Sequence, residues 1–89
     1  MSGSSIPKPM PLEAHEIRER LARLRPNSGI VRVTQRQGLF APDVFEGKFV
    51  GFANIGTEIF SLDLPGEGEI SFAVNRHSGI LDIEILRPF

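Results

Sequence analysis

From residue 29 onward, apolar and polar residues alternate in five short segments separated by turns that contain glycine or proline. In one segment Ile70, Phe72 and Val74 occupy one side, and polar or small residues lie between them. A period of two places successive side chains on opposite faces of the backbone, which is typical of a strand with one buried face. The chain is therefore expected to build most of its core on a β-sheet.

The alternation and the turns between the segments together predict where the strands lie. We expect five strands, over residues 30–36, 48–54, 58–64, 69–75 and 80–86. Most of the connections are short and contain glycine, so successive strands are expected to pair as an antiparallel meander. In a simple meander the first strand lies at an edge of the sheet. Its unpaired backbone could recruit another strand, or Arg32 and Arg36 could be there to prevent such pairing.

Before the strands, the sequence has the pattern of one amphipathic helix. Its apolar residues fall at spacings of three and four: Ala14, Ile17, Leu21 and Leu24. Pro11 suits the first helical position, and Pro26 disfavours helical geometry in the residue before it. The predicted fold class is thus α+β, with one N-terminal helix packed on a five-stranded antiparallel meander sheet.

Length and composition bound the domain organisation. Residues 1–10 are rich in Ser, Gly and Pro and are expected to form a disordered leader, and residues 11–89 are expected to form a single domain. The chain has no cysteine, so its stability must come from packing or association rather than from disulfides. No long apolar run predicts a membrane span, and we expect a cytoplasmic location.

No group of residues has the spacing of a known catalytic or metal-binding motif. His77 beside Ser78, with Asp82 nearby, lacks the geometry of a triad, which is assembled in space from separate segments. His15 and Glu19 share a helical face, but two ligands are fewer than a protein-held zinc ion needs. We therefore expect neither enzymatic activity, nor a cofactor, nor a bound metal.

The expected sheet is wider than one helix can cover. Five strands at a spacing of about 4.8 Å span roughly 24 Å, whereas a helix with its side chains is about 10 to 12 Å across. Strand 48–54 adds to this imbalance, because in a regular strand Phe49 points opposite to Val50 and Phe52. The excess apolar area must be covered by strong curling of the sheet, by the apolar segment 37–47, or by a partner.

This excess predicts a small non-enzymatic interaction or regulatory module that self-associates, with a homodimer favoured and another protein as a further partner. The candidate interface residues lie in and just after the apolar segment 37–47: Leu39, Phe40, Val44, Phe45 and Phe49.

Two other functions remain open from the sequence. One is nucleic-acid binding by basic side chains of the first strand and the helix end: Arg32, Arg36, Arg23 and Arg25. A net charge of −1 and the absence of Trp and Tyr argue against that function, because single-strand readers use basic grooves and exposed rings. The other is a small-ligand site in a pocket between the helix and the sheet.

Charge is distributed unevenly along the chain. Residues 1–48 contain eight basic and five acidic side chains, whereas residues 49–89 contain two basic and six acidic ones. Since both halves belong to one compact domain, this asymmetry predicts a dipolar surface. Such a surface favours docking to a protein over coating a nucleic acid.

Overall fold

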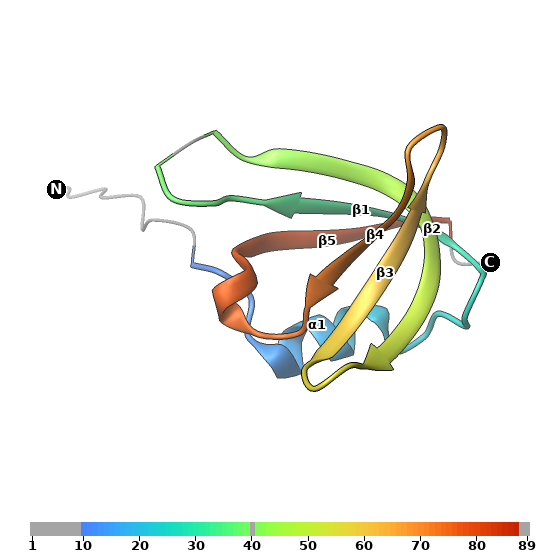
Figure 1. The fold of residues 1–89 in the computed structure, drawn as a ribbon, viewed down its shortest axis with the longest axis horizontal. Coiled ribbons are helices and arrows are strands. Elements are labelled where there is room, and N and C mark those ends of the chain that lie inside the picture. Colours follow the sequence, from blue (N-terminus) through green and yellow to red (C-terminus); the bar gives the residue numbers. More distant parts are fainter. Residues whose placement is uncertain (1–9, 40, 88–89) are drawn as a thin grey trace, which may run out of the picture.

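The computed structural model describes residues 10–39 and 41–87 and confirms an α+β fold with one helix and five antiparallel strands. The elements follow in the order α1 (Ala14–Leu21), β1 (Ile30–Gln35), β2 (Asp43–Asn54), β3 (Glu58–Leu64), β4 (Gly68–Ala73), the 3₁₀ turn η1 (Arg76–Ser78) and β5 (Ile80–Arg87). The sheet curls strongly without closing, and α1 lies beneath it (Figure 1). Among the described residues, no helix has the length and apolarity to cross a membrane.

The strand order is β4-β3-β2-β1-β5, so the first four strands form the expected meander and the fifth does not continue it. Instead of pairing with β4, strand β5 returns to the other side of the sheet and pairs with β1. The expectation that the first strand is an edge strand is therefore wrong, because β1 is paired on both sides. The two edges of the sheet are β4 and β5.

The connection from β4 to β5 explains this return. Asn75 and η1 turn the chain, and Gly79 then adopts a left-handed conformation with φ of 75°. A Cβ atom on Gly79 would collide with the backbone carbonyl oxygen of Arg36, at the end of β1. The Arg36 N–H donates to the Gly79 carbonyl at 2.9 Å, and the Gln35 side chain donates to the Ser78 carbonyl at 2.6 Å. These contacts fix the start of β5 beside the end of β1.

Strand β2 has 12 residues and begins at Asp43, within the segment expected to be a loop. Val44 and Phe45 pair with β1, so only residues 36–42 connect the two strands. Lys48 is opposite Ile30 of β1 on one side and opposite Asp63 of β3 on the other. One long strand thus belongs to two halves of the sheet.

Gly47 lies at a close contact between β2 and β3. A Cβ atom on Gly47 would lie 2.6 Å from the carbonyl oxygen of Asp63 and 2.9 Å from Leu64 Cδ2. Because any larger residue would force β3 away at this position, glycine allows the two neighbouring strands to approach each other closely. Of the three expected coverings, strong curling of the sheet is seen in the fold (Figure 1).

A β-bulge in β2 overturns the expectation that Phe49 and Phe52 point to opposite faces. Phe49 is opposite Leu62, but Gly51 is opposite Ser61, so the register shifts between Phe49 and Gly51. The extra residue brings Phe52 to the side of Phe49, and the two ring centroids are 5.6 Å apart. Strand β2 is therefore less apolar on its second face than regular alternation predicts.

Helix α1 is shorter than expected and begins at Ala14 instead of near Pro11. The Leu12 N–H donates to the carbonyl oxygen of Ile80 at 2.7 Å, so the segment before the helix is held extended against β5. The expected apolar stripe is confirmed, since Ile17 and Leu21 are fully buried.

The core lies between α1 and the concave face of the sheet. It contains residues from the helix region and from all five strands: Leu12, Ile17, Leu21, Leu24, Val31, Val33, Phe49, Phe60, Leu62, Leu64, Phe72, Val74, Ile80 and Ile83.

Candidate interaction surface

The predicted interface residues fall in different environments. Leu39, in the connection from β1 to β2, is 96% exposed, and Val44, near the start of β2, is 56% exposed. Phe45 is half-buried against the core, whereas Phe49 belongs to the core itself. Phe40 lies outside the described residues. Of the five residues, Leu39, Val44 and Phe45 therefore contribute to the surface.

Phe45 links this surface to the edge strand β4. Its ring meets the ring of Phe72 edge to face at a centroid distance of 5.5 Å, and Phe72 stacks on Phe60 at 5.1 Å. Ile70, two residues before Phe72, is also half-buried at the margin of the core. We call Phe45, Ile70 and the adjoining outer edge of β4 the open rim.

The backbone of the open rim is unpaired on one side. The Val74 N–H donates to the Glu58 carbonyl at 2.9 Å, which shows that the Val74 backbone faces β3. Backbone groups alternate in direction along a strand, so those of Glu69, Ser71 and Ala73 point away from β3. Within residues 10–39 and 41–87, no hydrogen bond reaches these outward backbone groups. The edge can therefore accept another strand.

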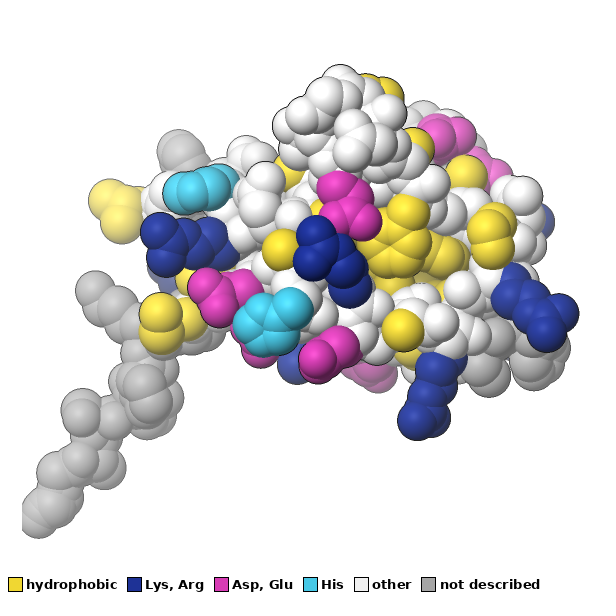
Figure 2. Space-filling view, turned by 90° about the horizontal axis from the view of Figure 1, so that it is seen from below, with side chains coloured by type: hydrophobic (Ala, Val, Ile, Leu, Met, Phe, Trp, Pro, Cys, Tyr) yellow, Lys and Arg dark blue, Asp and Glu magenta, His cyan; other side chains and the backbone are white. Residues whose placement is uncertain are grey.

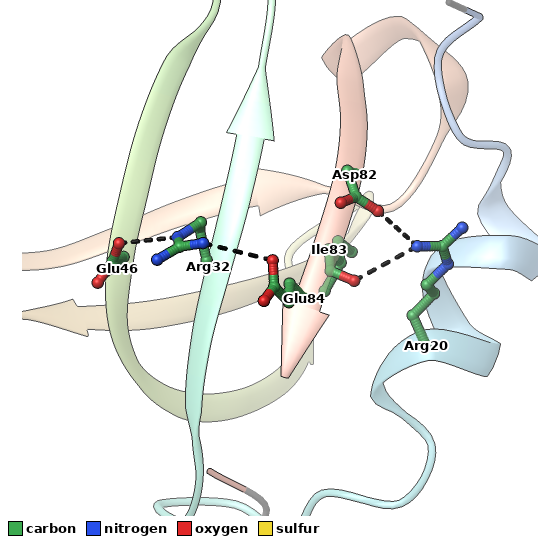
Figure 3. A network of polar contacts seen from close by, with 6 residues as sticks. All are labelled: Arg20, Arg32, Glu46, Asp82, Ile83 and Glu84. Carbon is green, nitrogen blue, oxygen red and sulfur yellow. Dashed lines mark hydrogen bonds and ion pairs between the residues drawn. The ribbon is translucent and has the colours of Figure 1, made fainter. Parts of the chain in front are cut away.

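The opposite edge, on β5, is partly covered by the N-terminal part of the chain. The Ile80 carbonyl accepts a hydrogen bond from the Leu12 N–H, and the Ile83 carbonyl accepts one from Arg20 Nη1 at 3.4 Å. Arg20 is held in place by Asp82, whose Oδ1 lies 2.6 Å from the same nitrogen (Figure 3). These contacts occupy two carbonyl groups that another strand would need.

A ladder of charged side chains crosses the convex face of the sheet. Arg32 on β1 donates to Glu46 of β2 at 2.8 Å and to Glu84 of β5 at 3.4 Å (Figure 3). The hydrogen bond to Glu46 is the main reason why the pKa of Arg32 is raised above its ordinary value. Since two carboxylates hold this guanidinium, it is a poor candidate for contacting phosphate.

The other arginines considered for nucleic-acid binding are spread along the fold. Arg23 and Arg25 are exposed in the segment after α1, before β1 begins, and Arg36 is exposed beyond its end. The length of β1, about 20 Å for six residues, separates Arg25 from Arg36. The geometry thus gives no compact basic surface from these side chains.

Ion pairs between the two halves of the sequence neutralise much of the uneven charge. Arg18 of α1 pairs with Glu58 of β3 at 2.6 Å, and Arg20 pairs with Asp82 of β5 at 2.6 Å. Hydrogen bonding to Glu58 raises the pKa of Arg18 above its ordinary value. These ion pairs therefore cancel a large part of the charge asymmetry that predicted a dipolar surface.

Two of the residues considered for catalysis, His77 and Ser78, form hydrogen bonds within the turn before β5. The Asn75 side chain accepts a hydrogen bond from the His77 N–H at 2.9 Å, and Ser78 Oγ donates to the Asn75 carbonyl at 2.8 Å. Asp82 faces Arg20 instead. The three groups do not converge on a common point of reaction.

A shallow groove of about 310 Å³ lies where the chain enters α1, beside η1, and not between the helix and the sheet. It is lined by Met10, Pro11, Leu12, Glu13, Glu16 and Arg76. Glu13, His15 and Glu16 place ligand atoms within 4.8 Å of one another here. Glu16 Oε1, however, accepts the Glu13 N–H at 3.1 Å, so helix capping explains this arrangement.

A second apolar surface, missed from the sequence, lies at the turn between β2 and β3. Phe52 is 41% exposed and Ile55 is 76% exposed. Apolar side chains are visible among charged groups on the underside of the molecule (Figure 2). The only sequence signal was Gly51, which marks the bulge that redirects Phe52.

Comparison with known proteins gives no further guide to function. No protein-family model matches the chain, and neither the curated proteins nor the solved structures compared with it yield a match.

Proposed function

We propose that the chain is a small non-enzymatic protein-interaction module that self-associates through the open rim. The observation that carries this proposal is the combination of an unpaired strand edge with apolar side chains beside it. Phe45 and Ile70 are half-buried at the rim, and the backbone of β4 next to them has no partner within the described residues. A bound strand would pair the backbone and cover these side chains together.

The rim supports a weak, reversible association. Each 100 Å² of apolar surface removed from water contributes about 2.5 kcal/mol before the costs of association are subtracted. The rim has one strand of six residues and two half-buried apolar side chains, so its area is at the low end for specific interfaces. We expect a dimer that dissociates on dilution into the low micromolar range.

The oligomeric state tests this proposal directly. Sedimentation velocity from about 1 to about 300 μM is expected to show a rising average mass, since this range spans weak dissociation constants. A monomer throughout the range would contradict self-association.

A matched pair of substitutions locates the surface. Ile70 on β4 and Ile85 on β5 are each part-exposed on an edge strand. We expect Ile70→Thr to weaken the association and Ile85→Thr to leave it unchanged, because only β4 belongs to the open rim. Equal effects, or a larger effect of Ile85→Thr, would place the interface elsewhere.

A further inference from the structure

We infer that the strand added at the open rim is β4 of a second copy, paired antiparallel about a twofold axis at Ser71. This inference rests on the proposed self-association and names its partner and geometry. The result is one continuous sheet through two protomers. Its first support is the set of outward backbone groups on β4, which belong to Glu69, Ser71 and Ala73.

The spacing of these groups favours one register. Hydrogen-bonded pairs in an antiparallel ladder need outward groups on both strands. With Ser71 opposite Ser71 of the second copy, Glu69 lies opposite Ala73, and all three residues of each strand find a partner. A register that placed Glu69 opposite Glu69 would bring like charges together. Pairing centred on Ser71 therefore forms the backbone hydrogen bonds of all three residues without that repulsion.

Charge along β4 favours antiparallel pairing with a copy of itself. Glu67 and Glu69 lie around the start of the strand, and Arg76 follows its end. Within the described part of the chain none of the three forms an ion pair. Antiparallel pairing brings the acidic start of each strand toward the basic end of the other. The strand is thus complementary in charge to an antiparallel copy of itself, and this favours a second copy of the chain as the partner.

The covered edge on β5 makes a head-to-tail arrangement unfavourable. Leu12 and Arg20 already occupy the carbonyl groups of Ile80 and Ile83. Pairing of β4 with β5 of another copy would displace both contacts, and repetition of it would give rings or fibres. Pairing of β4 with β4 involves only the uncovered edge of each copy, so the assembly is complete as a dimer.

Ser71→Pro tests the pairing, with Ser71→Ala as its control. Proline removes the central N–H and is tolerated on edge strands where that group faces solvent, whereas alanine removes only the hydroxyl that contacts Ser61 at 2.8 Å. Relative to Ser71→Ala, we expect Ser71→Pro to raise the dimer dissociation constant roughly tenfold or more. Circular dichroism establishes that both variants are folded.

A charge exchange tests the geometry without changing the backbone. We expect Arg76→Glu to weaken the dimer severalfold at low salt, and Glu67→Arg combined with Arg76→Glu to restore it. A wild-type chain that is monomeric at all concentrations would overturn the proposed function and this inference together. A wild-type dimer that both Ser71→Pro and Arg76→Glu leave intact, or association beyond two copies, would overturn this inference alone.

Discussion

The two edges of the sheet differ in how the fold treats them. At the β5 edge, Leu12 donates to the Ile80 carbonyl and Arg20 to the Ile83 carbonyl, so the chain's own N-terminal part covers the backbone. At the β4 edge, no such contact exists among the described residues, and Phe45 and Ile70 remain half-buried beside it. Proteins commonly protect exposed edges against unwanted pairing. This difference between the edges is why the proposed pairing is assigned to β4.

The largest expected effect comes from the close contact between β2 and β3 at Gly47, between the two edges of the sheet. Gly47→Ala would bring a Cβ within 2.6 Å of the Asp63 carbonyl oxygen, so β2 and β3 must move apart. We expect the free energy of unfolding to fall by about 1 to 3 kcal/mol, as for other overpacked sites. Urea denaturation measures this loss.

Gly56→Ala separates the two ways in which a side chain can destabilise a glycine position, because Gly56 has open space around it and a positive φ of 96°. Gly47 has no positive φ, so the loss for Gly47→Ala is expected to come from the collision with β3. An unchanged free energy of unfolding in Gly47→Ala would mean that this close contact does not constrain the sheet.

The next effect concerns the cover of the β5 edge. Arg20→Met removes the hydrogen bond to Ile83 and the ion pair with Asp82. We expect association beyond the dimer in light scattering, since a second edge becomes accessible, with a stability loss of only about 0.2 to 1 kcal/mol. Arg23→Met, an exposed position in the segment after α1, controls for the lost charge. Identical scattering from the two variants would mean that Arg20 does not protect the edge.

The smallest effect is expected at the charged ladder that ties β5 to β1 and β2. Arg32→Met is expected to lower the free energy of unfolding only slightly, because its partners are exposed, and the loss should shrink as salt is added. Because the pKa of Arg32 is raised, this contribution is fully present from neutral pH up to the ordinary arginine value and is lost as the pH rises through the raised value. A large or salt-independent loss in urea denaturation would contradict this account of the ladder.

Much of the fold follows from local pattern. The stripe through Ile17 and Leu21 predicted the buried side of α1, and alternation predicted β3 over residues 58–64 as observed. The extension of β2 back to Asp43 was missed because its pairing with β1 is a long-range property. Likewise, the bulge after Phe49 moves every later side chain of the strand to the opposite face. The alternation of apolar and polar residues alone does not predict such a bulge.

The candidate surface was only partly predictable. Of the interface residues predicted from the apolar segment between strands, Leu39 and Val44 are exposed, Phe45 is half-buried and Phe49 belongs to the core. Their role in an interface stays a prediction. That β4 is an edge strand depends on the path of β5 through η1 and Gly79, which no local pattern encodes. The open edge of the proposed interface therefore depends on topology, whereas the apolar side chains beside it can be recognised in the sequence.

Amide hydrogen exchange as a function of protein concentration tests the pairing of β4 most directly. Exchange at Glu69, Ser71 and Ala73 is expected to be fast in the dilute chain and to slow as the dimer forms, because their N–H groups then enter a ladder. Ile70 and Phe72 should be protected at every concentration, since their backbone faces β3. Fast exchange at Ser71 under conditions where sedimentation shows a dimer would contradict the account.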